Sequence, residues 1–154
     1  TLRAEHARST MIDVPDGQLV VIPEVNGDTL ELIVEMVPAQ DGCCSIVVRR
    51  SPDGAEHTQI TYDAALRQVI VNRTQSSQDL TTDRNLHAAP LTLGPDEPLR
   101  LHVFLDRSVL EVFVNERVSI TSRIYPSRTD SLGVALLADR GEARLLSLDA
   151  WQIR

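Results

Sequence analysis

Alternation of apolar and polar residues is strongest between Leu99 and Pro126, and this stretch predicts three antiparallel strands. Aliphatic residues take every second position on both sides of Arg107 and Ser108, which is the period of a half-buried strand. With these two residues as the turn, the pattern pairs Leu105 with Leu110, Val103 with Val112 and Leu101 with Val114. A shift of one residue would move every aliphatic side chain to the other face, so the register is predicted together with the strands.

A three-residue turn at Asn115, Glu116 and Arg117 continues this aliphatic face into the third strand. It sets Val114 opposite Val118 and Val112 opposite Ile120. The other face is mixed in character and is expected to be partly covered or ion-paired; it holds Arg100, His102, Phe104, Glu111, Phe113, Thr121 and Arg123. Glu111 lies diagonal to Arg123 in this register, and an ion pair between them is predicted.

Shorter apolar stretches separated by turn residues predict strands along the rest of the chain, and no 3.6-residue apolar period persists. The predicted strands are 11–14, 19–22, 29–36, 46–50, 58–62, 67–73, 133–138 and 143–153, the last two forming a closing hairpin around 139–141. About a dozen short strands are typical of an antiparallel β-sandwich or barrel with little or no helix. Residues 1–14 are expected to link the domain to a preceding segment. Residues 74–96 are expected to form a long loop that is functional or packed on a partner.

The stretch 143–153 is unusual because both of its faces look buried. In a regular strand, Leu146, Leu148 and Ala150 share one side, whereas Leu145, Trp151 and Ile153 share the other. We therefore expect part of an apolar docking patch here.

Composition indicates a single globular domain over residues 1–154, and excludes several classes of partner. With 42% hydrophobic residues, a chain of this length buries roughly 70% of its unfolded surface, and no apolar run reaches membrane-spanning length. The net charge of -7 opposes binding to nucleic acid or to an anionic membrane. No secretory signal is visible at Thr1, and the compartment, cytoplasmic or secreted, is left open.

Candidate chemistry is sparse. Cys43 and Cys44 are adjacent, so on a strand they point to opposite faces, and two free thiols, one of them buried, are expected. The histidines lie at positions 6, 57, 87 and 102 without metal-ligand spacing. Phosphate-binding glycine loops and nucleophile elbows are also absent from the sequence. We therefore expect no metal and no cofactor.

The central stretch resembles the C-terminal domain of glycoside hydrolase family 32, the family of invertases, levanases and exo-inulinases. The resemblance lies in FLDRS, EVFVN and TSRIYP, with a weaker match at SLDAW, and it extends over essentially the whole chain. The signature positions are Asp106, Arg107, Ser108, Glu111, Phe113, Arg123, Tyr125 and Trp151. It implies a two-sheet antiparallel β-sandwich of the concanavalin or laminin-G-like type, packed behind a separate five-bladed β-propeller that carries the catalysis.

The resemblance does not bring catalytic residues with it. Glycoside hydrolysis needs two carboxyl groups flanking the scissile bond. The family's Asn-Asp-Pro, Arg-Asp-Pro and Glu-Cys segments do not occur in this sequence. Asp106 and Glu111 belong to one hairpin, and turn-stabilising and ion-pairing roles are expected for them. By itself the chain is expected not to hydrolyse fructosides.

Three functions remain: a structural module of a β-fructosidase acting on sucrose or fructans, an independent fructan-binding module, or an oligomerisation module. Sugar-binding modules commonly offer flat aromatic surfaces, whereas only 3% of this chain is aromatic, and most of those residues lie in predicted strands. This favours the structural role. The implied partner is the propeller; self-association and weak carbohydrate binding stay open, and no ligand-binding residue can be named.

Overall fold

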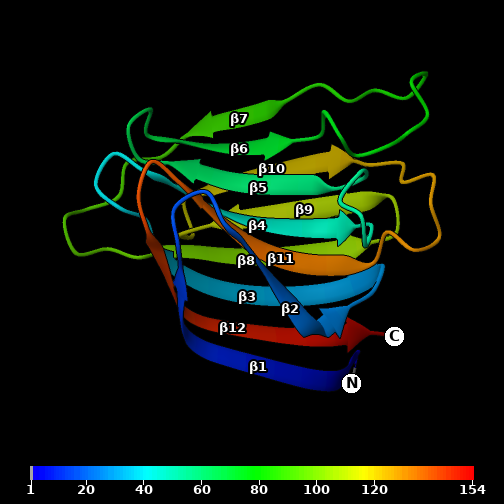
Figure 1. The fold of residues 1–154 in the computed structure, drawn as a ribbon, viewed down its shortest axis with the longest axis horizontal. Helices are drawn as coiled ribbons and strands as arrows, with labels where there is room; N and C mark the ends of the chain where they lie inside the picture. The colour runs from blue at the N-terminus through cyan, green and yellow to red at the C-terminus, as the bar shows by residue number, and fades with distance from the viewer. Residues whose placement is uncertain (1) are drawn as a thin grey trace.

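The computed structural model describes residues 2–154, which form two six-stranded antiparallel sheets packed face to face (Figure 1). Sheet A has the order β1 (Arg3–Val14), β12 (Ala143–Ile153), β3 (Thr29–Val37), β8 (Leu99–Asp106), β9 (Val109–Val114) and β10 (Val118–Arg123). Sheet B has the order β2 (Leu19–Asn26), β11 (Gly133–Asp139), β4 (Cys43–Arg50), β5 (Thr58–Asp63), β6 (Gln68–Asn72) and β7 (His87–Pro90). The predicted all-β sandwich is confirmed. Over residues 2–154 no helix forms, and hence none that could cross a membrane.

The core between the sheets is aliphatic because alternate residues of each strand point inward. Met36, Ile46 and Leu105 are among the side chains with no exposed surface, and burying each such side chain contributes roughly 1.5–3 kcal/mol. Tyr62 is the aromatic residue of this core, and its hydroxyl donates to the Leu91 carbonyl oxygen at 3.1 Å. The other large rings of residues 2–154 are therefore outside the core.

The predicted register of the central meander is confirmed. Leu105 pairs with Leu110 and Val103 with Val112 across the two-residue turn, and Val114 pairs with Val118 across the three-residue turn. Arg107, Asn115 and Glu116 have positive φ angles of 54°, 48° and 57°. These left-handed conformations are the ones that such tight hairpin turns require.

Two strand connections differ from the prediction. The closing hairpin is wrong, because β11 lies in sheet B and β12 in sheet A, so the turn at 139–141 crosses between the sheets. The loop 74–96 contains a short strand, β7, which pairs with β6. Period alone cannot tell a hairpin from a crossing between sheets, since both need a strand, a turn and a second strand.

The two long edge strands also differ from their expected form. The strand predicted at 11–14 is present but begins at Arg3, and it pairs with β12 along almost its whole length. In β12 the register shifts between Leu145 and Ser147, so Leu145, Leu148 and Ala150 all enter the core. The expected two-sided apolar strand is therefore wrong, because a β-bulge resets the alternation.

Two buried arginines join the sheets through backbone carbonyls. Arg49 Nε donates to the Ser131 oxygen at 2.7 Å, and Nη1 donates to the Arg107 oxygen at 2.8 Å. Arg73, 1% exposed, donates to the Asn85 oxygen at 2.8 Å and to the Arg123 oxygen at 2.7 Å. A guanidinium suits this task because it holds several donors in one fixed plane.

A buried carboxylate organises the loops at the end of the sandwich where the chain termini lie (Figure 1). Glu56 is fully buried, and its oxygens accept from Gln78 N, from Ser127 N and Oγ, from Arg128 N and from Ser131 Oγ. Burial raises the pKa of Glu56, but these hydrogen bonds outweigh it and lower the pKa to about 2. The carboxylate is thus a structural tie between three loops.

The two cysteines behave as predicted. Both are free thiols, and Cys44 is buried while Cys43 is partly exposed on the other face of β4. Burial raises the pKa of the Cys44 thiol to about 12 and also raises that of Cys43. Neither is activated for nucleophilic chemistry.

Candidate functional site

The outer face of sheet A carries charged, histidine and aromatic side chains in cross-strand rows. Two cross-strand rows run over all six strands: His6, Trp151, Glu31, Phe104, Glu111 and Thr121 in one, and Arg8, Asp149, Ile33, His102, Phe113 and Ser119 in the other. Their neighbours along each strand point into the core. Opposed side chains in such rows lie close enough to interact.

Glu31 is the centre of this face. Its side chain is only 8% exposed, although it points away from the core. Arg3 donates from Nε and Nη2 at 2.7 and 2.6 Å, and His102 Nε2 lies 2.8 Å from the same carboxylate. The hydrogen bonds from Arg3 outweigh the opposing effect of burial, and with those from His102 they lower the pKa of Glu31 to about 2.

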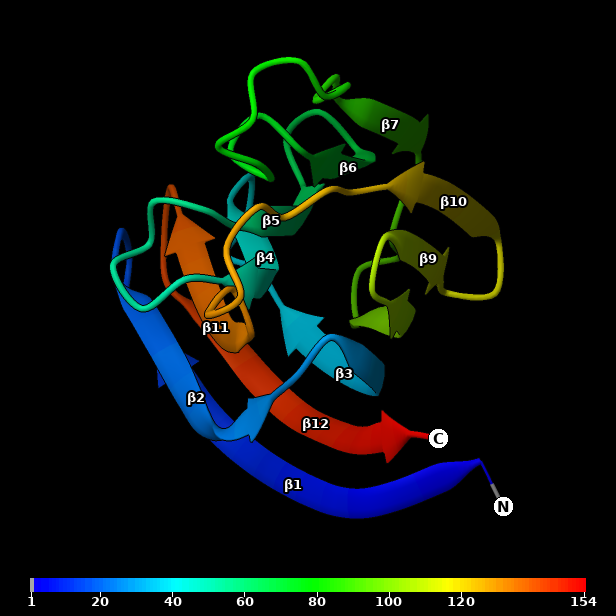
Figure 2. The same cartoon turned by 90° about the vertical axis from the view of Figure 1, so that its right-hand side faces the viewer.

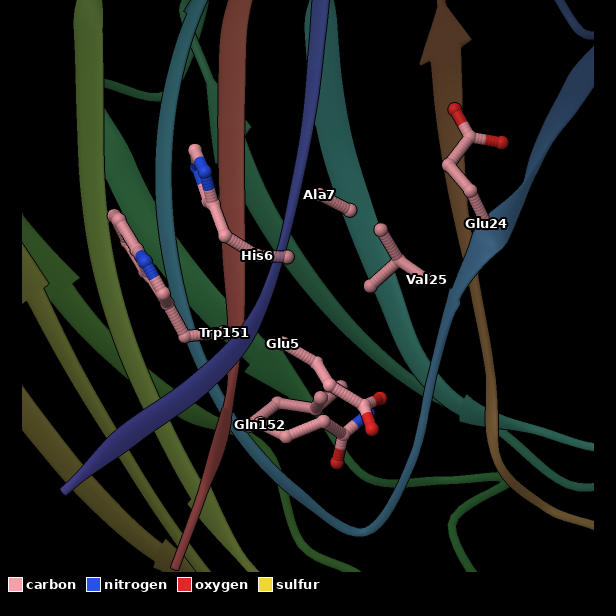
Figure 3. Close-up of a pocket in the computed structure, with 9 residues that line it drawn as sticks. Glu5, His6, Ala7, Glu24, Val25, Trp151 and Gln152 are labelled. Carbon is pink, nitrogen blue, oxygen red and sulfur yellow. The ribbon is translucent and has the colours of Figure 1, made fainter.

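Trp151 is enclosed by its neighbours. The His6 ring stacks on the indole with 4.8 Å between ring centroids and 12° between planes, as Figure 3 shows. The Arg3 guanidinium lies 4.0 Å from the indole centroid and reaches from β1 across β12 to Glu31 on β3. His6 and Arg3 both contact the indole, so less of its surface is available for stacking on a sugar.

A hollow between β1 and β2, at one open edge of the sandwich, is lined among others by Glu5, Glu24 and Gln152. Glu5 lies beside Gln152, whereas Glu24 stands apart on β2 (Figure 3). Glu5 has a φ of 25° and occupies a bulge between Ala4 and His6. Ser9 Oγ donates to Glu24 at 2.9 Å, and Glu5 lies 3.9 Å from Arg154. Both carboxylates therefore have structural partners, and residues 2–154 hold no cluster of three metal-ligating side chains.

A histidine and a serine meet at the opposite edge, but not as a catalytic pair. His87 Nδ1 lies 2.6 Å from Ser122 Oγ, and His87 Nε2 lies 3.1 Å from Arg73 Nη2. Because a guanidinium can only donate, Nε2 must accept and the imidazole proton sits on Nδ1. His87 then donates to Ser122 and cannot remove its proton.

The signature residues lie on the outer face of sheet A and at its rim. Arg123 Nη2 donates to Ser108 Oγ at 3.0 Å, and its guanidinium lies 5.6 Å from the Tyr125 ring centroid. Phe113 and Tyr125 are each 41% exposed. Phe113 lies near Phe104, edge to face, with 6.2 Å between centroids.

The predicted ion pair between Glu111 and Arg123 is wrong, although the register that suggested it is correct. Arg123 pairs with Val109, directly after Ser108, and its guanidinium is used there. Over residues 2–154, neither Glu111 nor Asp106 lies within 4.0 Å of a basic side chain, so the ion-pairing role expected for both is also wrong.

The sequence did not reveal Arg3, Glu31, Glu56 and the two buried arginines. Glu31 and Glu35 occupy equivalent polar positions of the same amphipathic strand. What separates them is the neighbour that reaches over from β1, some thirty residues earlier in the chain. No local signal carries that information.

Comparison with known proteins places the whole chain in one family model, glycosyl hydrolases family 32 C terminal, over residues 1–152. The sucrose-6-phosphate hydrolase of Zymomonas mobilis is 31% identical over 99% of this chain and 30% of that protein. The extracellular exo-inulinase of Aspergillus awamori is 30% identical over 71% of this chain and 21% of that protein. The chain thus spans about a third or less of these relatives.

Solved structures agree on the fold. The exo-inulinase structure from Aspergillus awamori matches with a TM-score of 0.80 and 23% identity, over 99% of this chain and 29% of that chain. Fructan 1-exohydrolase IIa from Cichorium intybus matches with a TM-score of 0.88 and 15% identity, over 99% of this chain and 36% of that chain.

Proposed function

We propose a non-catalytic, structural role for this chain, which belongs to the family 32 glycosyl hydrolase C-terminal domains. In this role it is the C-terminal module of a β-fructosidase that acts on sucrose or fructans, and it stabilises the catalytic domain. The observation that carries the proposal is the match of residues 1–152 to a C-terminal family model, together with relatives of which this chain covers only 30% and 21%.

The geometry of the candidate site supports this role. Hydrolysis of a glycoside needs an acid and a nucleophile or base across the scissile bond. Hydrogen bonds strongly lower the pKa of three carboxylates of residues 2–154: those of Glu31 and Glu56 lie at about 2, and that of Asp53 lies well below its usual range. An acid at such a pKa is ionised at neutral pH and cannot protonate a leaving group.

The experiment compares the full-length enzyme with a variant that lacks this domain. Deletion is expected to lower the temperature at which fructosidase activity is lost, because a stabilising contact surface is removed. Unchanged heat resistance and expression would overturn the structural role. The isolated chain is expected to show no hydrolysis of sucrose, inulin or levan. Turnover that Asp106→Asn or Glu111→Gln abolishes would contradict the proposal.

Carbohydrate binding is the second candidate, and the exposed rings of Phe113 and Tyr125 are the observation that favours it. Enclosure of Trp151 by His6 and Arg3 weighs against it. Calorimetric titration of the isolated chain with inulin or levan oligosaccharides decides between the two. Micromolar binding lost in Phe113→Ala would establish a binding module instead.

A further inference from the structure

We propose that the outer face of sheet A, around Phe113, Phe104 and His102, is the surface that the catalytic domain of the same polypeptide covers. This inference rests on the proposed function and deepens it by naming the contact face. The family match by itself does not say which of the two outer faces the catalytic domain covers.

The distribution of aromatic residues is the first argument. The core is aliphatic apart from Tyr62, whereas Phe104, Phe113 and Trp151 stand on the outer face of sheet A and Tyr125 at its rim. An aromatic ring contributes most when it is removed from water. Aromatic residues and arginine are enriched at the buried centres of protein interfaces. A domain that places its rings outside its own core has a partner surface there.

The position of the chain ends is the second argument. In a C-terminal domain, the preceding part of the enzyme joins at the start of β1, and β1 is an edge strand of sheet A. Arg154 N donates to the Leu2 oxygen at 2.9 Å, so both ends lie together. Sheet A is curved, and the chain ends lie on the side of it that is turned away from sheet B (Figure 2). A domain joined at Leu2 reaches this face without crossing the sandwich.

Free carboxylates are the third argument. A hollow on this face is lined by Thr29, Phe104, Leu105, Asp106, Arg107, Glu111, Ile153 and Arg154. Its two arginines do not neutralise its carboxylates, because the one ion pair between them and an acidic side chain in the described part of the chain is that of Arg154 with Glu5. Asp106 and Glu111 have no basic partner within 4.0 Å in the described part of the chain, while Glu31 and Asp149 on the same face are fully paired. We expect arginine or lysine side chains of the catalytic domain opposite this hollow, which complements a domain of net charge -7.

The outer face of sheet B provides the matched control. Its exposed apolar residues, Leu19 and Val21, lie on the edge strand β2 and are 39% and 50% exposed. Val21 is therefore at least as accessible as Phe113 in the isolated domain. A charge placed at either position costs little in the isolated chain, whereas burial by a second domain makes it costly.

The test uses the full-length enzyme with Phe113→Arg and Val21→Arg. Phe113→Arg is expected to shorten the half-life of fructosidase activity at elevated temperature roughly tenfold, the range of an interface hot spot, and Val21→Arg to leave it unchanged. Both isolated chains must unfold at the wild-type urea midpoint. Equal half-lives for the three enzymes, or a loss confined to Val21→Arg, would overturn the choice of face.

Hydroxyl-radical footprinting gives a second readout without any variant. Oxidation of Phe113 and Tyr125 is expected to fall severalfold in the full-length enzyme relative to the isolated chain, while Leu19 and Val21 react equally in both. Protection that instead rises with the concentration of the isolated chain would assign the face to a second copy and overturn the proposal. A domain deletion without effect on heat resistance would refute the structural role separately, whichever face is protected.

Discussion

The two outer faces of this sandwich are built on the same strand geometry but hold opposite kinds of side chain. On sheet A the rows combine rings with charges. On sheet B the two central rows are uncharged: Val21, Ala135, Val47, Gln59 and Asn72 in one, and Leu19, Leu137, Ser45, Thr61, Ile70 and Ala88 in the other. Charge enters at the end of this face, in the row of Asp139, Cys43, Asp63 and Gln68. At the centre of sheet B, Ala135 and Val47 are already buried.

The two sheets shield their outer faces from solvent in different ways. Sheet B is closed by small side chains that cover one another, with Ser45 Oγ and Thr61 Oγ1 2.8 Å apart. Sheet A is closed by a network from Arg8 through Asp149, His6, Trp151 and Arg3 to Glu31, which leaves Phe113 exposed. The first face needs no partner, whereas the second keeps rings and carboxylates available for one.

The largest effect in the isolated chain is expected for Glu31→Ala. Removing the carboxylate takes away the acceptor that Arg3 and His102 share; Glu31 itself is 8% exposed, whereas its two partners are 47% and 39% exposed. We expect a loss of about 3 kcal/mol in the free energy of unfolding, measured by urea denaturation. The control is Glu35→Ala on the same strand, whose exposed pair with Arg100 should contribute under about 1 kcal/mol. Equal losses would show that the network does not stabilise this face.

A substitution on sheet A should destabilise the chain in a pH-dependent way, whereas one on sheet B should not. The pKa of Glu31 is lowered from 4.5 to about 2, so its contribution is complete above pH 4.5 and is lost as the pH falls toward 2. Glu31→Gln should be less stable than wild type at pH 6, by about 2 kcal/mol, and this gap should close at acid pH. Thr61→Val on sheet B should show a gap independent of pH. A pH-independent gap for Glu31→Gln would contradict the assignment.

Substitutions in the packed outer rows of sheet B should lower the free energy of unfolding by less than the Glu31 substitutions, but by a measurable amount. Val47→Ala removes two methyl groups from a side chain that is 2% exposed, and we expect a loss of about 1.5 kcal/mol. Val21→Ala, on the same row but half exposed, should change the unfolding free energy by under about 0.5 kcal/mol. If both variants behaved alike, the centre of sheet B would be open to solvent.

The smallest expected effect is that of His6→Ala. Loss of one cross-strand stack should cost under about 1 kcal/mol. Trp151 is the single tryptophan of the chain, so its fluorescence reports this contact directly. Emission should shift to longer wavelength as the indole becomes more exposed, and His87→Ala, at the far edge, should leave the emission unchanged. An unaltered spectrum in His6→Ala would show that the ring is shielded by other groups.

The central meander shows how much of the fold the local pattern of apolar and polar residues can predict. Its strands, both turns and the pairing of Leu105 with Leu110 follow from a period of two combined with turns of fixed length. The same reasoning failed for β12, where a bulge at Leu146 resets the alternation, and for the connection of β11 to β12, where the chain changes sheets. Neither a bulge nor a crossing between sheets requires a particular residue type, so the pattern of apolar and polar residues does not reveal them.

The sequence by itself determined the β class, the positions of most strands, the register of β8 to β10, the state of the cysteines and the family. The strands and their register depend on residues close together in the sequence, where apolar period and turn chemistry act directly. Only the tertiary structure decided that Trp151 joins Phe104 and Phe113 on one outer face, how Arg3 reaches Glu31, and why Arg123 bonds to Ser108 and not to Glu111. These contacts join residues brought together by sheet order, and a side chain selects its partner by distance in space.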